Sequence, residues 1–169
     1  MAKLETATFG GGCFWGTEEL FRQIKGVKET VVGYMGGDKI DPTYQEVCDD
    51  TTGHVEVVQM TYDPSLTAYG KLLEVFWMAH HPMQADGQGN DIGSQYRPVI
   101  FYHSEAQKKL AEKSKENEQK KYPRPIATSI EPAATFWRAE EYHQKYLVKN
   151  PGGYCHINVK AVLSKAQPK

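Results

Sequence analysis

The order of apolar and polar positions predicts a chain in which short strands and longer helices alternate. Short runs rich in β-branched and aromatic residues are typical of strands, and they fall at 4–9, 27–34, 54–62, 99–102 and 125–130. Apolar residues at helical spacing predict four helices, at 14–24, 65–79, 104–121 and 132–147. Elements in this order indicate an α+β domain of two layers, with helices packed on a mixed sheet.

Irregular segments separate these elements. Glycine and proline mark a loop at 33–42 that leads to Tyr44, and the segment 80–97 is long, polar and contains several glycines. Long irregular loops inside compact domains are more often functional than accidental. No internal repeat or linker divides the chain. Residues 1–169 are therefore expected to form a single domain, with an irregular C-terminal tail at 149–169.

Composition and charge bound the class of protein. The chain has 169 residues, enough for one hydrophobic core, and its net charge of −1 favours neither nucleic acid nor an anionic membrane as a partner. Residues 1–6 contain no apolar signal core and no membrane-spanning run, which predicts a cytoplasmic protein. The three cysteines cannot form a framework of structural disulfides, so they are expected to be reactive or buried thiols.

Cys13 is the strongest candidate for a reactive group, because it follows three glycines, 10–12, at the predicted junction of a strand and a helix. A helix start favours an anion and can lower a cysteine pKa from about 8.5 to ~3.5–7.5. The alternative is an inert buried cysteine. A phosphatase loop is disfavoured, because Glu18-Glu19 occupy the place of its arginine. Since Phe14 and Trp15 are adjacent and face different ways on a helix, one of them is expected to line a surface pocket.

Glu56 is the most informative acidic residue. In the predicted strand it shares a face with His54 and Val58, while Val55 and Val57 lie on the other face. Burial among apolar neighbours raises the pKa of a carboxyl group, which can then stay protonated near neutral pH and act as an acid. The alternative is a carboxylate in solvent at a strand edge, and the residues alone do not decide between the two.

Other polar residues lie in less regular surroundings. Tyr44 and Tyr96 could each offer a phenolic O–H to a substrate oxygen, although packing is the commoner role of a loop tyrosine. Asp91, between glycines, fits a turn. His80-His81 has no companion ligands at zinc-like spacing, so no metal site is expected. His143 is expected to be a satisfied core histidine.

The two other cysteines differ in their surroundings. Cys155 follows Pro151-Gly152-Gly153 on the tail. A thiol that can travel is able to attack an oxidised sulfur elsewhere, and redox cysteines are often found with such a resolving partner. Cys48 has no such glycine-rich or helix-start surroundings, and it is expected to be buried and inert.

Short motifs along nearly the whole chain resemble those of the A-type peptide methionine sulfoxide reductases. They occur in the expected order and are jointly very specific, although each alone would be weak. The motifs are Gly11-Gly12-Cys13-Phe14-Trp15 with Glu18, Thr52-Gly53-His54-Val55-Glu56, Gln88-Gly89-Asn90-Asp91-Ile92-Gly93-Ser94-Gln95-Tyr96-Arg97, Ala139-Glu140-Glu141-Tyr142-His143-Gln144 and Gly153-Tyr154-Cys155. The resemblance implies a two-layer α/β roll of ferredoxin-like kind that reduces the S epimer of methionine sulfoxide.

The resemblance implies how the substrate is held. Phe14 and Trp15 would form an apolar pocket for the substrate methyl group. The groups that would hydrogen-bond the sulfoxide oxygen are Tyr44, Glu56 and Tyr96. Glu56 would also supply a proton to this oxygen, and Asp91 would orient the network through water. These roles suit the chemistry, because breaking the S–O bond requires protonation as the sulfur is attacked.

The resemblance also implies a redox cycle. Cys13 would attack the sulfoxide sulfur and end as a sulfenic acid, while the methionine leaves reduced. Cys155 would condense with the sulfenic acid to a disulfide that thioredoxin reduces, and neither a bound cofactor nor a metal is implied. The substrates would be oxidised proteins and peptides and free methionine sulfoxide, handled by a monomeric catalytic domain.

Two departures from the family pattern lie outside the expected catalytic set. His80-His81-Pro82-Met83 replaces the more usual His-Asp-Pro-Thr, and Asp49-Asp50 stand where smaller residues are common. Cys48 has counterparts in some members only, which leaves open a role as a third relay thiol. Two other classes compete with the reductase: a hydrolase with Cys13 as nucleophile and His143 as base, and a thiol redox sensor without turnover.

Overall fold

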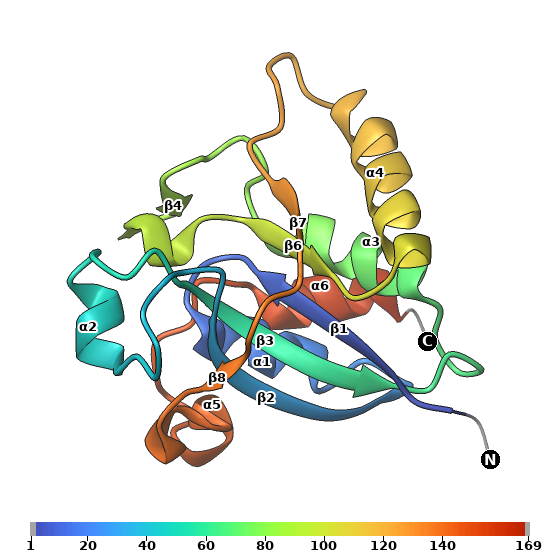
Figure 1. Cartoon of the computed structure of the whole chain (residues 1–169). Helices are drawn as coiled ribbons and strands as arrows, with labels where there is room; N and C mark the ends of the chain where they lie inside the picture. The colour runs from blue at the N-terminus through green and yellow to red at the C-terminus, as the bar shows by residue number, and fades with distance from the viewer. Residues whose placement is uncertain (1–2, 168–169) are drawn as a thin grey trace.

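The computed structural model describes residues 3–167 and confirms a mixed sheet covered by helices (Figure 1). The strands of the sheet are β1 Glu5–Gly10, β2 Val27–Met35, β3 Val55–Tyr62, β6 Val99–Tyr102, β7 Ser129–Pro132 and β8 Trp137–Arg138. They lie in the order β7-β6-β1-β3-β2-β8, in which only β6 and β7 run parallel. Residues 1–2 and 168–169 of the predicted domain and tail lie outside the described residues.

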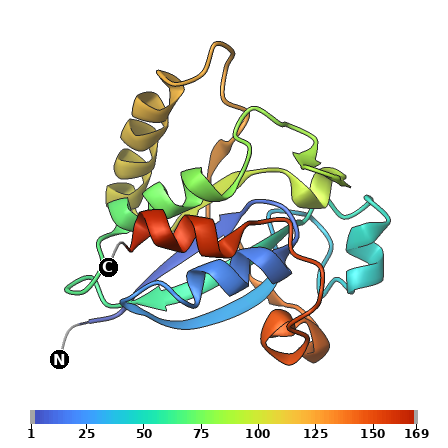
Figure 2. The same ribbon diagram turned by 180° about the vertical axis from the view of Figure 1, so that it is seen from behind.

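Helices cover one face of the sheet, and the larger hydrophobic core lies beneath them. The helices on this face are α1 Phe14–Phe21, α3 Tyr69–Ala79 and α6 Val159–Ala166, with α4 Glu105–Gln119 beside α3 (Figure 2). Phe9 of β1 lies at the centre of this core, with its ring centroid 5.3 Å from that of Phe21 and 4.9 Å from that of Phe76. Each such aromatic buries a large apolar area, so this layer holds α1 firmly on the sheet.

The opposite face of the sheet is covered by the chain that follows β7. A second buried cluster lies there, formed by Met35, Val55, Val57, Val99 and Phe101. Phe136 packs against this cluster from outside. Both faces of β3 are therefore buried, and its sequence shows no clean alternation of apolar and polar residues. Glu56 consequently has protein on both sides of its strand.

The helix predicted at 132–147 is wrong. The segment instead contains the end of β7, then β8, the 3-10 turn η2 (Glu141–His143) and the short helix α5 (Tyr146–Lys149). Apolar residues that share helical spacing here serve different partners, since Phe136 packs on the second core and Ala139 belongs to the larger one. Contacts with distant parts of the chain override the local pattern.

Five further elements lie in segments predicted to be irregular. The helix α2 (Tyr44–Cys48) follows the glycine-rich loop, and Thr43 and Glu46 form a capping box at its start. The segment 80–97 contains the two-residue strands β4 (Gly87–Gln88) and β5 (Asp91–Ile92) and the 3-10 turn η1 (Ser94–Tyr96). The tail contains α6, whose Asn158 side chain accepts the Ala161 N–H at 3.1 Å.

The starts of α3 and α4 differ in their capping. Ser104 caps α4, because its hydroxyl accepts the N–H of Gln107. The N-cap of α3 is Ala68, which makes no side-chain hydrogen bond. The strand expected at 125–130 begins only at Ser129. Within residues 3–167, no helix is long and apolar enough to cross a membrane.

Replacing Gln144 with leucine is expected to destabilise the fold. The buried Gln144 amide accepts the N–H of Val32 at 2.9 Å and donates to the carbonyls of Val32 and Ala139 at 2.8 and 3.0 Å. Leaving these buried groups unpaired costs about 2–4 kcal/mol of unfolding free energy, which urea denaturation measures. The same substitution at the exposed Gln23, Gln23→Leu, should change the free energy of unfolding by only ~0.5 kcal/mol. Equal midpoints for the two variants would contradict this account.

Candidate active site

Neighbouring strands bring Cys13 and Glu56 together. Cys13 is the N-cap of α1, directly after β1, and Glu56 is the second residue of β3, which pairs with β1. Gly10 allows the close approach, because a Cβ there would lie 2.6 Å from Cγ1 of Val55. The Phe14 N–H donates to Oε1 of Glu56 at 3.2 Å and so ties the start of α1 to β3.

The Glu56 carboxyl group is removed from water. The residue is 1% exposed, and Oε2 is buried with no hydrogen-bond partner among residues 3–167. Burial raises the pKa of Glu56 to about 8, the Phe14 N–H opposes this rise, and the charge of Asp91 adds to it. Of the two alternatives that the sequence left open, the structure has the buried carboxyl group with a raised pKa, which is mostly protonated at neutral pH.

Burial also governs the Cys13 thiol, against the prediction of a low pKa. Cys13 is 8% exposed. Loss of water raises its pKa well above the ordinary value, the charge of Glu56 raises it further, and only a bond from the Trp15 N–H lowers it. A single N–H at the helix start does not offset desolvation, so burial raises the pKa of Cys13 instead of the helix start lowering it.

Tyr44 and Tyr96 approach the same carboxyl group from two elements. Tyr44 begins α2 and Tyr96 ends η1. Burial raises the pKa of both phenols, and the charge of Glu56 contributes to both rises, which puts each ring within electrostatic reach of that carboxyl. Both phenols therefore keep their protons and can act as O–H donors, which is compatible with the donor hypothesis.

Phe14 and Trp15 diverge as expected for neighbours on a helix. Phe14 is buried, with its ring centroid 5.8 Å from that of Tyr34. Trp15 is partly exposed and stacks on Tyr146 at 3.7 Å. Its Nε1–H donates to Nδ1 of His143 at 2.9 Å. One aromatic ring thus belongs to the core, and the other reaches the surface beside the nucleophile.

Glu140, the N-cap of η2, and His143 within η2 support this arrangement, and the sequence analysis did not predict these roles. Glu140 accepts the O–H of Tyr34 at 2.9 Å and the N–H of Tyr44 at 2.8 Å, so it holds the start of α2. His143 is buried, but its Nε2 has no partner within the described chain, so it is not the satisfied core histidine that was expected. The wrong helix at 132–147 hid these contacts, and the motif at 139–144 was the available signal.

Cys155 lies against the first turns of α1. Its Sγ is 3.0 Å from the position that a Cβ on Gly16 would take, and the thiol donates to the Ile157 carbonyl at 3.2 Å. The preceding Tyr154 donates its O–H to Oδ2 of Asp91 at 2.9 Å. Asp91 lies in β5 rather than in the expected turn, and its charge helps to raise the pKa of Glu56. Asp91 of β5 and the stretch of tail that carries Cys155 therefore border the site together, joined by the bond from Tyr154.

The remaining candidates contribute less. Cys48 is only partly buried at the end of α2, not buried as expected, and all three cysteines are free. Both ring nitrogens of His80 are within hydrogen-bond distance of protein oxygens, at 2.7 Å from the Phe76 carbonyl and 2.8 Å from Oγ1 of Thr128. Between residues 3 and 167, no three side chains of metal-ligating type form a group that could hold an ion. Within the same residues, no hydrogen bond joins Cys13 to His143. Nδ1 of His143 accepts from Trp15, and Nε2 has no partner.

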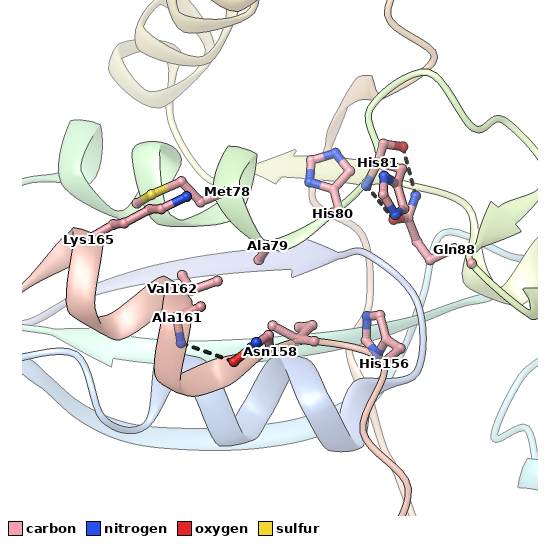
Figure 3. Close-up of a pocket in the computed structure, with 12 residues that line it drawn as sticks. Met78, Ala79, His80, His81, Gln88, His156, Asn158, Ala161, Val162 and Lys165 are labelled. Atoms are coloured by element: carbon pink, nitrogen blue, oxygen red, sulfur yellow. Dashed lines mark hydrogen bonds between the residues drawn. The ribbon is translucent and has the colours of Figure 1, made fainter.

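A groove of about 280 Å³ lies beside the site rather than in it (Figure 3). Residues lining it include Met78, His81, Gln88, His156, Asn158 and Lys165. His156 separates the groove from the loop before Cys13, because its Nε2 lies 2.9 Å from the Gly11 carbonyl oxygen. Both His156 and Gln88 also lie where a Cβ on Gly12 would point, at 2.6 and 3.0 Å.

Comparison with known proteins agrees with this geometry. The family model described as peptide methionine sulfoxide reductase matches residues 5–169. The peptide methionine sulfoxide reductase MsrA of Methanoculleus marisnigri is 58% identical over 154 residues, which cover 90% of this chain and 94% of the relative. The chain therefore belongs to the peptide methionine sulfoxide reductase family.

Solved structures give the same picture. The structure of Mxr1 from Saccharomyces cerevisiae in reduced form superposes with a TM-score of 0.87 at 40% identity, covering 91% of this chain and 90% of that one. The structure of Mxr1 in complex with Trx2 gives a TM-score of 0.62 at 29% identity, with 85% of each chain covered.

The raised pKa of Glu56 predicts how stability depends on pH. The carboxyl group ionises near 4.5 in the unfolded chain but near 8 in the folded protein. The folded state thus binds more protons between these values. The free energy of unfolding of the wild type should therefore fall, relative to that of Glu56→Gln, by about 3–5 kcal/mol as pH rises from ~5 to ~8.

Urea denaturation at several pH values measures this difference. Glu116→Gln, on the exposed face of α4, is the control and should follow the wild type. Parallel stability curves for wild type and Glu56→Gln across this range would show that the folded state does not keep Glu56 protonated.

Proposed function

We propose that this protein reduces methionine S-sulfoxide, free or within oxidised proteins and peptides, with Cys13 as the nucleophile. One observation carries the proposal: a buried carboxyl group with an unpartnered oxygen, and a pKa of about 8, lies beside a buried thiol. A sulfoxide suits both groups, because its oxygen can accept the proton of the Glu56 carboxyl group and its sulfur can be attacked by the Cys13 thiol. Family membership supports the same reaction.

In the first step, Cys13 attacks the sulfoxide sulfur. Glu56 donates a proton to the oxygen, with the O–H groups of Tyr44 and Tyr96 hydrogen-bonded to it. The S–O bond of the substrate breaks, the hydroxyl passes to the Cys13 sulfur, and the proton of the Cys13 thiol restores Glu56. One thiol is oxidised to a sulfenic acid and one sulfoxide is reduced to a thioether, so atoms and electrons balance.

The surrounding residues support this step in different ways. Phe14 and Trp15 would hold the substrate methyl group, and the partial exposure of Trp15 gives a bound peptide a route to the surface. Asp91 would orient the acid through water, because its charge already acts on Glu56. The tyrosines stay neutral and so act as donors without contributing negative charge.

In the second step, Cys155 attacks the Cys13 sulfenic acid and forms a disulfide with loss of water. A thioredoxin would then reduce the disulfide; the complex of Mxr1 with Trx2 supports such a partner. We further propose that residues 1–169 act as one catalytic domain, a monomer, whose tail at 149–169 carries the resolving cysteine. A cytoplasmic location stays a prediction.

Separated epimers of methionine sulfoxide test the whole scheme. With thioredoxin and its reductase, wild type should turn over the S epimer steadily. Cys155→Ser should release about one methionine per enzyme and stop, because its sulfenic acid has no resolving thiol. Steady turnover by both proteins would remove Cys155 from the obligatory path. No methionine from either would exclude the reductase and favour a hydrolase or a sensor.

Variants of Glu56 test the acid. The first methionine should appear more slowly as pH rises through about 8, because the wild-type carboxyl group loses its proton there. Glu56→Gln keeps the shape and a hydrogen-bond donor, so it should retain some activity and lose this pH dependence. Glu56→Asp is too short to reach the oxygen and should lose about 10²–10⁴-fold. Near-wild-type rates in both variants, measured by quenched flow, would remove Glu56 from the mechanism.

A further inference from the structure

Cys155 lies between two side chains that bind the active-site region. On one side, the Tyr154 O–H donates to Asp91 at 2.9 Å. On the other, Nε2 of His156 is 2.9 Å from the carbonyl oxygen of Gly11, two residues before Cys13. A carbonyl only accepts, so Nε2 carries the hydrogen and Nδ1 is the bare nitrogen. Nδ1 is buried and has no partner within residues 3–167.

The imidazole ring of His156 fills space that two glycines leave open. A Cβ on Gly12 would lie 2.6 Å from Nε2 of His156, and a Cβ on Gly16 would lie 3.0 Å from its Nδ1. The same point above Gly16 is 3.0 Å from Sγ of Cys155. The ring and the Cys155 thiol are thus packed on one patch of the nucleophile helix.

This patch adjoins the turn that carries Cys13. Gly16 is the third residue of α1 and Cys13 is its N-cap, so the two residues lie within one turn of the helix. The influence of Cys155 on the pKa of Cys13 agrees with that proximity. A contact that holds His156 on this patch therefore also limits the distance between the sulfur atoms of Cys13 and Cys155.

We propose that His156 is a positioning residue for the resolving step: its bond to Gly11 and its packing on Gly12 and Gly16 hold the Cys155 thiol beside the turn that carries Cys13. This inference rests on the proposed function. In the step concerned, the Cys155 sulfur bonds to the Cys13 sulfur, the S–OH bond breaks, and the hydroxyl leaves as water with the Cys155 thiol proton. No further oxidant is required.

The size of the effect follows from proximity. A thiol and a sulfenic acid on one chain condense quickly only when their geometry is held, and a misplacement of about 1 Å can cost ~10²-fold. His156 touches neither the substrate nor the reacting sulfurs. Its loss should therefore leave sulfoxide reduction intact and slow only the formation of the disulfide.

Two substitutions separate the hydrogen bond from the bulk of the ring. His156→Leu keeps much of the bulk of the ring but removes the donor, whereas His156→Gln keeps an N–H donor of similar reach. A single turnover on methionine S-sulfoxide without reductant gives two readouts, methionine released and thiols lost to the disulfide. Dimedone, which labels sulfenic acids, reports the Cys13 sulfenic acid that has not yet reacted with Cys155.

In His156→Leu, methionine should appear at the wild-type rate, the disulfide should form about 10- to 100-fold more slowly, and dimedone should label Cys13. His156→Gln should recover most of the disulfide rate. A wild-type disulfide rate in His156→Leu would overturn the proposal, as would equal defects in the leucine and glutamine variants. If wild type itself releases no methionine, the proposed function fails, independently of His156.

A second substitution keeps the test decisive if His156→Leu does not fold. Gly16→Ala suits a helix and places a Cβ against both Cys155 and His156. The added methyl group should push the tail away from α1. Methionine release should then be retained while the disulfide forms slowly, as in His156→Leu. Unchanged disulfide formation in Gly16→Ala would overturn the proposal by an independent route.

Discussion

Removal of the Glu56 carboxyl group from water is the constraint on which the rest of the site depends. An ionised carboxylate without partners is costly in a protein interior, so the group keeps its proton up to a pKa of about 8. That state requires cover on both faces of β3. The helix layer supplies one cover, and the chain after β7, with Phe136, supplies the other. Water admitted through either layer would return the pKa toward its ordinary value and remove the acid at neutral pH.

The segment 139–147 is held to the site by side chains rather than by long regular elements. The buried Glu18 of α1 accepts the Thr30 hydroxyl at 2.8 Å and the ammonium of Lys145 at 2.9 Å. Gln144 binds the backbone of Val32 in the neighbouring strand. These bonds fix the segment 139–147 against α1 and β2, which places Glu140 under α2 and His143 beside Trp15. Irregular backbone in this region is thus a consequence of where its polar side chains find partners.

Features set by neighbours in the sequence could be predicted, and features set by distant contacts could not. The strand before Cys13 and the helix after it follow from local alternation and spacing. The burial of Glu56, which the residues alone left open, comes from the cover on both faces of β3. The helix expected at 132–147 failed because Phe136 and Ala139 pack into different cores. The helix α6 was missed although Val159, Val162 and Leu163 have helical spacing. The pKa of Cys13 was misjudged for the same reason, since desolvation depends on residues far along the chain.

A site that keeps both its thiol and its carboxyl group protonated has a chemical consequence. Thiolates, not thiols, react readily with oxidants, so a buried protonated Cys13 is poorly reactive toward adventitious peroxides. A sulfoxide changes this balance under the proposed function, because its oxygen accepts the Glu56 proton while its positively polarised sulfur stabilises a developing thiolate. Negative charge on the Cys13 sulfur then develops only as the bond to the substrate sulfur forms and neutralises it. The desolvation that suppresses the free thiolate therefore also selects for a ligand that presents an acceptor and an electrophile side by side.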